Sequence, residues 1–435
     1  MDRPENPQRP ILVIGAGVSG LLLAQYLRKT GVPFRIFERD ADLDTRGLGW
    51  GLTLHWSLPA LRSLLPDDLV LRLPEAYVDR AAVEEGRAST FPFFDLSTGE
   101  LKAKTPTASE SQRIRVTRDR LRRLLATGLD IQWEKAVNSI QTAQDGTVTV
   151  GFDDGTSCDG SFVAACDGGS SRLRGLLFPG HQKHHIPVRL MGVKVDCTPE
   201  EIEPLRKLDP FFLQGAASQN DSFVYFSVLD SPNNTHEGNG GKYTCQMTVS
   251  WPIREGFFNQ TAPMVFPDTN LGGIELIKTF AETWAEPFQS LARGIPDDTD
   301  VKYLELYDWP PPKGLRTTGR VALVGDAMHP MAMYRGEGAN HAIVDVVDLV
   351  ELVIMPQFVP GNDDSTATTT TRTAVDLRAA LDRYEDRVVG RSRPAVLASR
   401  QACLDAHQWS RINEKSPLLT RRAMDLAFDE TDMRV

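Results

Sequence analysis

ILVIGAGVSGLLLAQYLRKTGVPFRIFERD, residues 11–40, combines the patterns of a strand, a glycine-rich turn, a helix and a second strand. The apolar run at 11–14 is typical of a buried parallel strand. Apolar side chains then recur at helical spacing between residues 21 and 27, and Gly31 ends the helix before the strand at 34–37. The segment therefore predicts a βαβ unit, the opening of an α/β fold.

The turn inside this unit has the spacing G-x-G-x-x-G. Gly15 permits the tight turn, Gly17 lets the backbone approach a pyrophosphate, and Gly20 lets the helix lie close to the strand. The free N–H groups at the start of the helix then face the phosphates. Glu38 follows where an acid can bind the ribose hydroxyls of an adenosine. An ordinary tight turn explains the glycines but not the acid in register, so the unit predicts dinucleotide binding, with NAD and FAD both open at this point.

Composition limits the class of protein. A chain of 435 residues is long enough for two or three domains. Acidic residues outnumber basic ones by 58 to 48, which disfavours binding to nucleic-acid phosphates and favours a small organic partner. Five cysteines occur without a C-x-x-C pair, and no secretion signal is recognisable, so we expect a cytoplasmic protein. No apolar stretch is long enough for a membrane span.

The rest of the chain predicts a discontinuous arrangement of domains. Runs of β-branched and aromatic residues after residue 185 indicate a mostly antiparallel sheet, and GRVALVGDA at 319–327 restores a buried parallel strand. The predicted fold is α/β: a Rossmann-like dinucleotide-binding domain interleaved with a β-sheet substrate domain, followed by C-terminal helices. The expected ranges are 1–80, 105–184 and 300–355 for the first domain, 81–104 and 185–299 for the second, and 356–435 for a polar loop, at 361–373, plus helices.

Two further motifs follow the opening unit. CDGGSSRLR occupies residues 166–174, and GDAMHPMAMYRGEGANHAI occupies residues 325–343. The second motif begins with an acid after a strand and ends in another glycine turn that opens a helix. Taken singly, these features would fit an ordinary cap and an ordinary helix start. An extended dinucleotide must be held at both of its ends, and one glycine turn cannot do this, so the second turn has a reason to exist.

Together the three motifs resemble the FAD-dependent aromatic hydroxylases, the single-component flavoprotein monooxygenases with the p-hydroxybenzoate hydroxylase fold. The resemblance covers the chain from about residue 10 to about residue 400. The family pattern D-G-x-x-S-x-x-R is matched at 167–174, and G-D-A-x-H with a later G-x-G-x-N is matched at 325–340. The residues that the resemblance implies for FAD binding are Gly15, Gly17, Gly20, Glu38, Arg39, Gly51, Arg118, Asp167, Asp326, Gly336, Gly338, Ala339 and Asn340.

The resemblance also implies roles for several of these residues. Asp326 would hydrogen-bond the ribityl chain, Arg118 would contact the FAD, and Gly51 would lie in a loop of small residues beside the flavin. The turn at 336–340 opens a helix whose N–H groups would face the flavin N1 and C2 carbonyl, where negative charge collects on reduction. His329 is expected to be structural.

The sequence departs from the family at one place and lacks a metal site. Family members usually have a proline four residues after the motif histidine, beside the flavin face where oxygen reacts, and this chain has Met333 there. His181, His184 and His185 are close in sequence, but no clustered acid or cysteine completes a ligand set, so we expect a polar loop and no metal.

As a hypothesis from the resemblance, NAD(P)H reduces the FAD, O₂ forms a flavin C4a-hydroperoxide, and this species hydroxylates or epoxidises an aromatic or other electron-rich small molecule, as in natural-product biosynthesis. Some fungal relatives bind a phenolate with an arginine and a tyrosine of the sheet. Arg189 and Tyr225 lie in comparable places and are therefore the predicted catalytic residues. The substrate is expected against a group of aromatic residues, Phe211, Phe212, Tyr225, Phe226 and Trp251.

Other readings of the same motifs stay open. The protein would be a flavoprotein dehydrogenase or oxidase if no oxygen atom is inserted, or a non-catalytic dinucleotide-binding protein. We expect a monomer or a homodimer. The sequence does not distinguish NADH from NADPH, because this fold has no separate nicotinamide domain.

Overall fold

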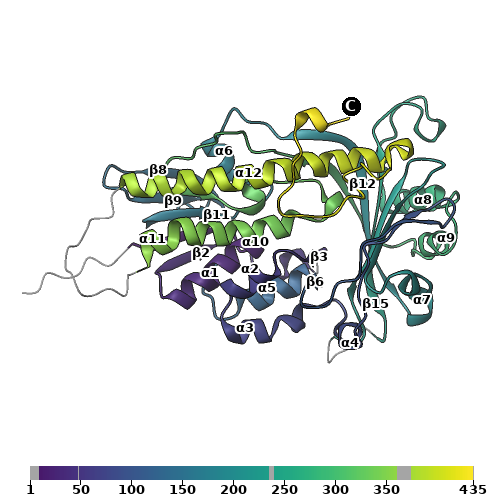
Figure 1. Ribbon diagram of the computed structural model, residues 1–435, viewed down its shortest axis with the longest axis horizontal. Helices are drawn as coiled ribbons and strands as arrows, with labels where there is room; N and C mark the ends of the chain where they lie inside the picture. The colour runs from purple at the N-terminus through teal and green to yellow at the C-terminus, as the bar shows by residue number, and fades with distance from the viewer. Residues whose placement is uncertain (1–8, 48, 235–239, 360–373, 435) are drawn as a thin grey trace, which may run out of the picture.

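The computed structural model describes residues 9–47, 49–234, 240–359 and 374–434. The polar loop predicted at 361–373 lies outside these residues. Figure 1 shows a parallel sheet with its helices at one end of the molecule and a larger sheet with its own helices at the other. Within the described residues, no helix has both the length and the apolar character that a bilayer crossing requires.

The first half is built on a five-stranded parallel sheet. Its central strand, β1, pairs with a neighbour on each side, and all four of its residues are buried. Such continuous burial is the rule for a parallel strand that is covered on both faces. The order of strands is β17 (Val321–Leu323), β11 (Phe162–Ala165), β1 (Ile11–Ile14), β2 (Phe34–Phe37) and β7 (Ile131–Gln132). The three sequence motifs follow β1, β11 and β17, which are adjacent, so their turns meet at one edge of the sheet.

Helices and a small antiparallel sheet cover this parallel sheet. Helix α1 (Val18–Thr30) contacts both α5 (Arg118–Ala126) and α10 (Gly338–Leu349). Helix α12 (Ala374–Ala406) contacts α10 and runs along the molecule toward the larger sheet (Figure 1). The three-stranded antiparallel sheet consists of β8 (Val137–Thr142), β9 (Val148–Phe152) and β10 (Ser157–Gly160). The shorter helices of this half are α2 (Leu58–Leu64), α3 (Asp67–Leu71), α6 (Arg172–Leu177) and α11 (Met355–Phe358). Helix α4 (Arg80–Glu84) instead contributes Ala82 to the core of the larger sheet.

The second half is a seven-stranded, mostly antiparallel sheet. Its order is β16 (Val301–Asp308), β12 (His184–Cys197), β15 (Tyr243–Pro252), β14 (Phe223–Asp230), β13 (Phe212–Ala216), β4 (Phe93–Asp95) and β5 (Leu101–Ala103). The helices α7 (Pro199–Leu208), α8 (Asn270–Ala281) and α9 (Phe288–Arg293) lie on its outer side (Figure 1). The structure confirms the predicted fold class, an α/β domain interleaved with an antiparallel sheet.

One predicted domain boundary is wrong. The sequence analysis placed residues 300–355 in the first domain, but β16 pairs antiparallel with β12 and belongs to the seven-stranded sheet. The reason is visible in the alternating burial of this strand, which fits a sheet edge with one covered face. The chain therefore returns to the parallel sheet only with β17.

The pleat of the large sheet decides which side chains can reach the interior between the two halves. On β14, Val224 and Phe226 belong to the outer core with α8 and α9, so Tyr225 between them points inward. On β12, Met191 belongs to that outer core and Leu190 faces inward. Arg189 has the same parity as Met191, and its partner across the sheet, Trp251, is also in the outer core.

Candidate cofactor and substrate site

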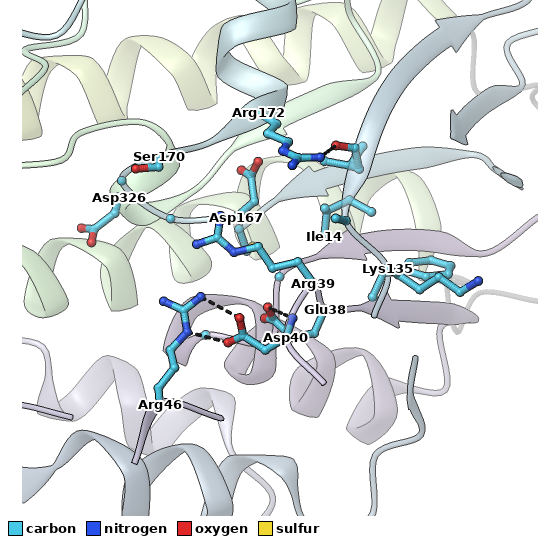
Figure 2. Close-up of a pocket in the computed structure, with 18 of the residues that line it drawn as sticks. Ile14, Glu38, Arg39, Asp40, Arg46, Lys135, Asp167, Ser170, Arg172 and Asp326 are labelled. Carbon is cyan, nitrogen blue, oxygen red and sulfur yellow. Dashed lines mark hydrogen bonds and ion pairs between the residues drawn. The ribbon is translucent and has the colours of Figure 1, made fainter. Parts of the chain in front are cut away.

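A cavity of about 300 Å³ opens at the carboxyl edge of the parallel sheet, where the first two motifs meet. This is the place where open α/β sheets bind their ligands. Figure 2 shows Glu38, Arg39 and Asp40 at the end of β2 on one side and Asp167 on the other. The remaining walls come from the first glycine turn, from α5 and from the segment that enters β8.

The three glycines of the first motif have different geometric reasons to be glycine. Gly15 has φ of +108°, and a Cβ there would lie 2.3 Å from the Cys166 carbonyl oxygen. A Cβ on Gly20 would lie 2.0 Å from the Gly15 carbonyl oxygen. In contrast, a Cβ on Gly17 would meet no atom within 4 Å, and Gly17 lines the cavity. Gly15 and Gly20 are thus required by the fold itself, whereas Gly17 leaves space for a ligand.

Glu38 closes the far end of this cavity. Its Oε2 accepts a hydrogen bond from the Ala16 backbone N–H (2.7 Å), and its Oε1 accepts one from Asp40 N–H (3.1 Å). These bonds fix the carboxylate beside the glycine turn. Asp40 in turn accepts a hydrogen bond from Arg46 Nη2 (2.8 Å), and Arg46 and Arg39 also line the cavity (Figure 2). Glu38 is placed where the sequence predicts the acid for a ribose.

The second motif is tied directly to the third. Arg174 donates hydrogen bonds to the carbonyl oxygens of Gly169 (2.7 Å), Asp326 (3.1 Å) and Ala327 (2.8 Å). Asp167 accepts from Leu173 N–H (3.2 Å) through Oδ2, while its buried Oδ1 has no hydrogen-bond partner within the part of the chain that the structure describes. Burial raises the pKa of the Asp167 carboxyl. One arginine therefore holds two motifs in a fixed relation, although Arg174 and Asp326 are 152 residues apart in sequence.

Arg118 and Asp326 stand where this cavity meets a second one. Both residues line both cavities. The Arg118 guanidinium makes no hydrogen bond or ion pair with any described residue, and burial lowers its pKa. The Asp326 side chain is open to the cavities although it lies deep in the molecule, and burial raises its pKa while Arg118 and Arg174 act in the opposite direction. The unpaired Arg118 guanidinium, at the junction of the two cavities, is suited to an anionic ligand.

The second cavity, of about 400 Å³, lies between the parallel sheet and the inner face of the seven-stranded sheet. One end is formed by the third motif, in which Gly336 has φ of +66° and α10 starts at Gly338 without a side-chain cap. Gly338 and Ala339 line the cavity. The rest of the lining is mostly apolar and aromatic: Leu52, Phe91, Leu190, Phe212, Phe223 and Tyr225, with Tyr334 of the third motif. Met333, at the position where the family usually has proline, also lines it.

Asn340 is not among the residues that line either cavity. Its Oδ1 accepts hydrogen bonds from His55 N–H (3.0 Å) and Ser57 Oγ–H (2.8 Å), and its Nδ2 donates to the Thr53 carbonyl oxygen (3.0 Å). The side chain thus fastens the start of α10 to the end of β3 (Gly51–Leu54). Any contribution to cofactor binding would come from the backbone of this turn.

The structure separates the two residues predicted to be catalytic. Tyr225 lines the second cavity. Arg189 does not line it, because its parity along β12 turns it to the outer face, where it donates a hydrogen bond to the Met264 carbonyl oxygen and lies 5.3 Å from the Phe266 ring. Of the predicted substrate aromatics, Phe212 and Tyr225 line the cavity, whereas Phe211, Phe226 and Trp251 belong to the outer core. The pairing of Arg189 with Tyr225 is therefore not supported by this geometry.

Arg115, which the sequence analysis passed over, lies beside Tyr225 instead. It is on β6 (Ile114–Thr117), and its guanidinium is 5.7 Å from the Tyr225 ring and 5.3 Å from the Phe212 ring. A Cβ on Gly51 would lie 2.3 Å from Arg115 Nη2, so the glycine predicted beside the flavin also makes room for this arginine. A charged residue inside a buried strand was the signal in the sequence that could have identified it.

The residues present fit an extended dinucleotide such as FAD. Glu38 and the first glycine turn suit the adenosine and pyrophosphate, Arg118 supplies an unpaired positive charge, and the open N-terminus of α10 suits the electron-accepting edge of a flavin. Gly17, Arg118 and Asp326 line both cavities, so the two cavities adjoin at these residues, and an extended ligand that contacts both would pass beside them.

Comparisons with known proteins agree with this geometry. The family model of the FAD-binding domain matches residues 8–219. A protein of Arthroderma benhamiae that carries the name "Probable FAD-dependent monooxygenase" is 43% identical over 97% of each chain. An FAD-dependent monooxygenase of Emericella nidulans is 35% identical over 87% of this chain and 95% of its own. The solved structure of 2,6-dihydroxypyridine-3-hydroxylase from Arthrobacter nicotinovorans superposes with a TM-score of 0.71 at 18% identity, over 97% of this chain and 99% of its own.

Proposed function

The chain belongs to the FAD-dependent aromatic hydroxylase family and is an FAD-dependent monooxygenase, and on this basis we propose that it uses NAD(P)H and O₂ to insert one oxygen atom into an electron-rich aromatic small molecule of a biosynthetic pathway. The observation that carries the proposal is that two adjoining cavities share Gly17, Arg118 and Asp326, one being polar and glycine-rich and the other mostly apolar and bounded by aromatic side chains. A redox cofactor in the first cavity and an aromatic substrate in the second would then lie next to each other.

In this proposal different predicted residues contact different parts of the cofactor. Gly17, Glu38 and Arg118 hold its adenosine and pyrophosphate, and Asp326 hydrogen-bonds its ribityl chain. The backbone N–H groups at the start of α10 stabilise negative charge on the flavin. The bound FAD would supply the redox chemistry, so no protein side chain needs to act as a nucleophile.

The chain's own contribution to the reaction is to orient the substrate and exclude water. The aromatic wall of the second cavity removes the substrate from solvent, and the Arg115 guanidinium beside Tyr225 gives it a polar anchor. Burial raises the pKa of the Tyr225 hydroxyl. Tyr225 is therefore protonated at neutral pH and can donate a hydrogen bond to a substrate oxygen.

Oxygen insertion is tested with the purified holoenzyme, NAD(P)H and a panel of phenols under ¹⁸O₂. We expect substrate-stimulated NAD(P)H oxidation and a product that carries one ¹⁸O atom. Unlabelled oxidised product, or hydrogen peroxide as the sole oxygen product with every substrate that stimulates oxidation, would instead indicate a dehydrogenase or an oxidase. The same assay with NADH and NADPH in parallel identifies the electron donor.

Replacing Arg118 with methionine is expected to weaken FAD binding about 10- to 100-fold, because a hydrogen bond to a charged group contributes about 1.5–3 kcal/mol. Arg123→Met is the matched control on the same helix, since the Arg123 side chain is 45% exposed, pairs with Asp119 (2.7 Å) and lines neither cavity. Titration of the apoproteins with FAD, followed by flavin fluorescence, measures both. Equal affinities for the two variants would remove Arg118 from the cofactor site.

A further inference from the structure

The inner face of the seven-stranded sheet carries a row of polar side chains where it bounds the second cavity. Gln214 of β13 pairs with Tyr225 of β14, which in turn pairs with Thr248 of β15. All three residues line the cavity. Directly paired residues point to the same face, and adjacent strands lie about 5 Å apart. The three side chains therefore form a row about 10 Å long, which we call the polar row.

The two ends of the polar row are buried and have no protein partner. Gln214 is 4% exposed and Thr248 is 1% exposed. Neither side chain forms a hydrogen bond with any residue in the described part of the chain, although both line the cavity. A buried amide or hydroxyl group costs free energy when it is left unpaired. These two groups are therefore suited to a ligand in the cavity.

The polar groups in the neighbouring rows of the same face are engaged by the protein. On one side, Ser227 Oγ accepts a hydrogen bond from Arg115 Nη2 (2.9 Å), and Gln246 Oε1 accepts one from a backbone N–H of β3 (3.1 Å). On the other side, Ser250 Oγ accepts one from the Tyr334 hydroxyl (2.8 Å). The oxygens in these rows are thus satisfied within the fold, whereas the two ends of the polar row are not.

An aromatic ring lies on the sheet at one end of the polar row. The strand beyond Thr248 contributes Gly192, which pairs with it directly. A Cβ on Gly192 would lie 2.7 Å from Trp50 Cη2, so the glycine leaves the space that the Trp50 ring occupies. Trp50 also lines the cavity. A ligand at the polar row therefore meets hydrogen-bonding groups along the row and a flat apolar surface at its end.

We propose that Gln214 and Thr248 determine which substrates bind, by hydrogen-bonding, together with Tyr225, two oxygen substituents on the same edge of the aromatic substrate. This inference rests on the proposed function and names the residues that select its substrate. Amide and hydroxyl groups both donate and accept, so the polar row can bind hydroxyl or carbonyl oxygens without a charge on either side.

The direction of these hydrogen bonds explains why one edge is selected. Hydrogen bonds to an sp² oxygen lie close to the plane of its substituents, so a straight row of partners holds a planar molecule by its edge. Members of the polar row are about 5 Å apart, and two oxygens on one edge can each reach a different member. A substrate with one of its oxygens on the opposite edge would leave Gln214 or Thr248 unpaired, and this cost is the basis of selection.

Binding of three neutral probes to the holoenzyme, without NAD(P)H, tests the proposal, with the change in flavin absorbance as the readout. The probes are 2,7-dihydroxynaphthalene, with both oxygens on one edge, 2,6-dihydroxynaphthalene, with oxygens on opposite edges, and 2-naphthol, with a single oxygen. The two diols have the same size and composition. We expect the 2,7-diol to bind about 3- to 10-fold more tightly than the 2,6-diol, as one additional hydrogen bond provides.

Gln214→Met and Thr248→Val remove the polar groups and nearly retain the shapes of the side chains. Each is expected to reduce the preference for the 2,7-diol to less than about twofold. Neither should lower the urea midpoint of the apoprotein, because no internal hydrogen bond is lost, whereas a merely structural role would lower it. Gln141→Met and Thr142→Val are the matched controls, since both residues are exposed on β8 and line neither cavity.

Equal binding of the two diols, no binding of either, or a preference that both variants retain would overturn the inference. Loss of FAD from the variants would also overturn it, because the polar row would then contact the cofactor. All of these results leave oxygen insertion intact if ¹⁸O still enters the product. Conversely, an edge preference that depends on Gln214 and Thr248, without labelled product from any substrate, would uphold the inference and contradict the proposed function.

Discussion

Asp345→Asn is expected to lower the free energy of unfolding by about 3–5 kcal/mol, the usual effect of breaking a buried, hydrogen-bonded ion pair. Asp345 is fully buried on α10. Its Oδ2 accepts a hydrogen bond from Gly325 N–H (2.8 Å) and lies 2.7 Å from His329 Nε2, and its Oδ1 accepts from Arg391 Nη2 (2.7 Å). An asparagine amide group would face Gly325 N–H or the Arg391 guanidinium whichever way it turned, and both are donors.

The same variant has a defined pH dependence. Burial alone would raise the pKa of the Asp345 carboxyl, but His329 and Arg391 hold it well below its usual range. A lowered pKa in the folded state stabilises the protein above the unfolded carboxyl pKa, about 4, and this contribution is lost as pH falls below that value. The stability difference between wild type and Asp345→Asn should therefore be constant near neutral pH and shrink in acid.

Urea denaturation at saturating FAD, followed by circular dichroism from pH 7 to pH 3, measures this difference. Glu351→Gln is the matched control, because Glu351 is 57% exposed and its pair with Arg387 spans 3.5 Å at the surface. We expect that control to change stability by less than about 1 kcal/mol. A loss below about 1 kcal/mol for Asp345→Asn would mean that the network adds no net stability.

This network also explains why a motif histidine need not be catalytic. His329 is fully buried, and its ring is fixed against Asp345, away from both cavities. Because Asp345 also binds Gly325 N–H, the pair sets the backbone just before Asp326. The histidine thus helps to position the acid predicted on the ribityl chain, and the structural role expected from the sequence has a physical basis.

Local spacing was enough to predict the parts of the site that lie on adjacent parallel strands. The glycine turn after β1, the motif after β11 and the motif after β17 are each contained in fewer than twenty residues, and the sheet brings them to one edge. The family assignment, the FAD monooxygenase activity and the fold class that followed from these motifs are confirmed. Short-range patterns carry this information because βαβ units fold back in only one way.

The substrate side of the site could not be predicted in the same way, because it depends on strand register and long-range contacts. Arg189 and Arg115 both occupy strands. Only the contacts of the folded chain, the pairing of Arg189 with Trp251 and its hydrogen bond to the Met264 carbonyl oxygen, show that Arg189 turns outward. The ladder between β12 and β16 is also irregular between Ile186 and Arg189. Counting alternate residues along the sequence therefore does not predict which face of the sheet each side chain occupies. Arg422, which also lines the second cavity, comes from a polar segment with no periodic pattern, and its position is set by contacts with Arg335.

Gly15→Ala is expected to destabilise the fold, whereas Gly17→Ala is expected to weaken FAD binding. The contrast between the two variants tests the cofactor geometry. Gly15→Ala forces a Cβ to 2.3 Å from the Cys166 carbonyl oxygen at a φ of +108°, so we expect a large loss of folded protein. Gly17 has φ of −81° and free space around it, so the Gly17→Ala apoprotein should be as stable as wild type within about 0.5 kcal/mol.

FAD binding should nevertheless fall at least tenfold in Gly17→Ala, about 1.4 kcal/mol, because the new methyl group occupies the space through which the backbone approaches the pyrophosphate. Thermal denaturation of the apoproteins and titration with FAD separate the two effects. If Gly17→Ala bound FAD as tightly as wild type, the cofactor would not approach this turn, and Glu38 and Arg118 would lose their predicted roles with it. A stable apoprotein that no longer retains FAD would instead place the pyrophosphate at Gly17, since no described protein atom competes for that space.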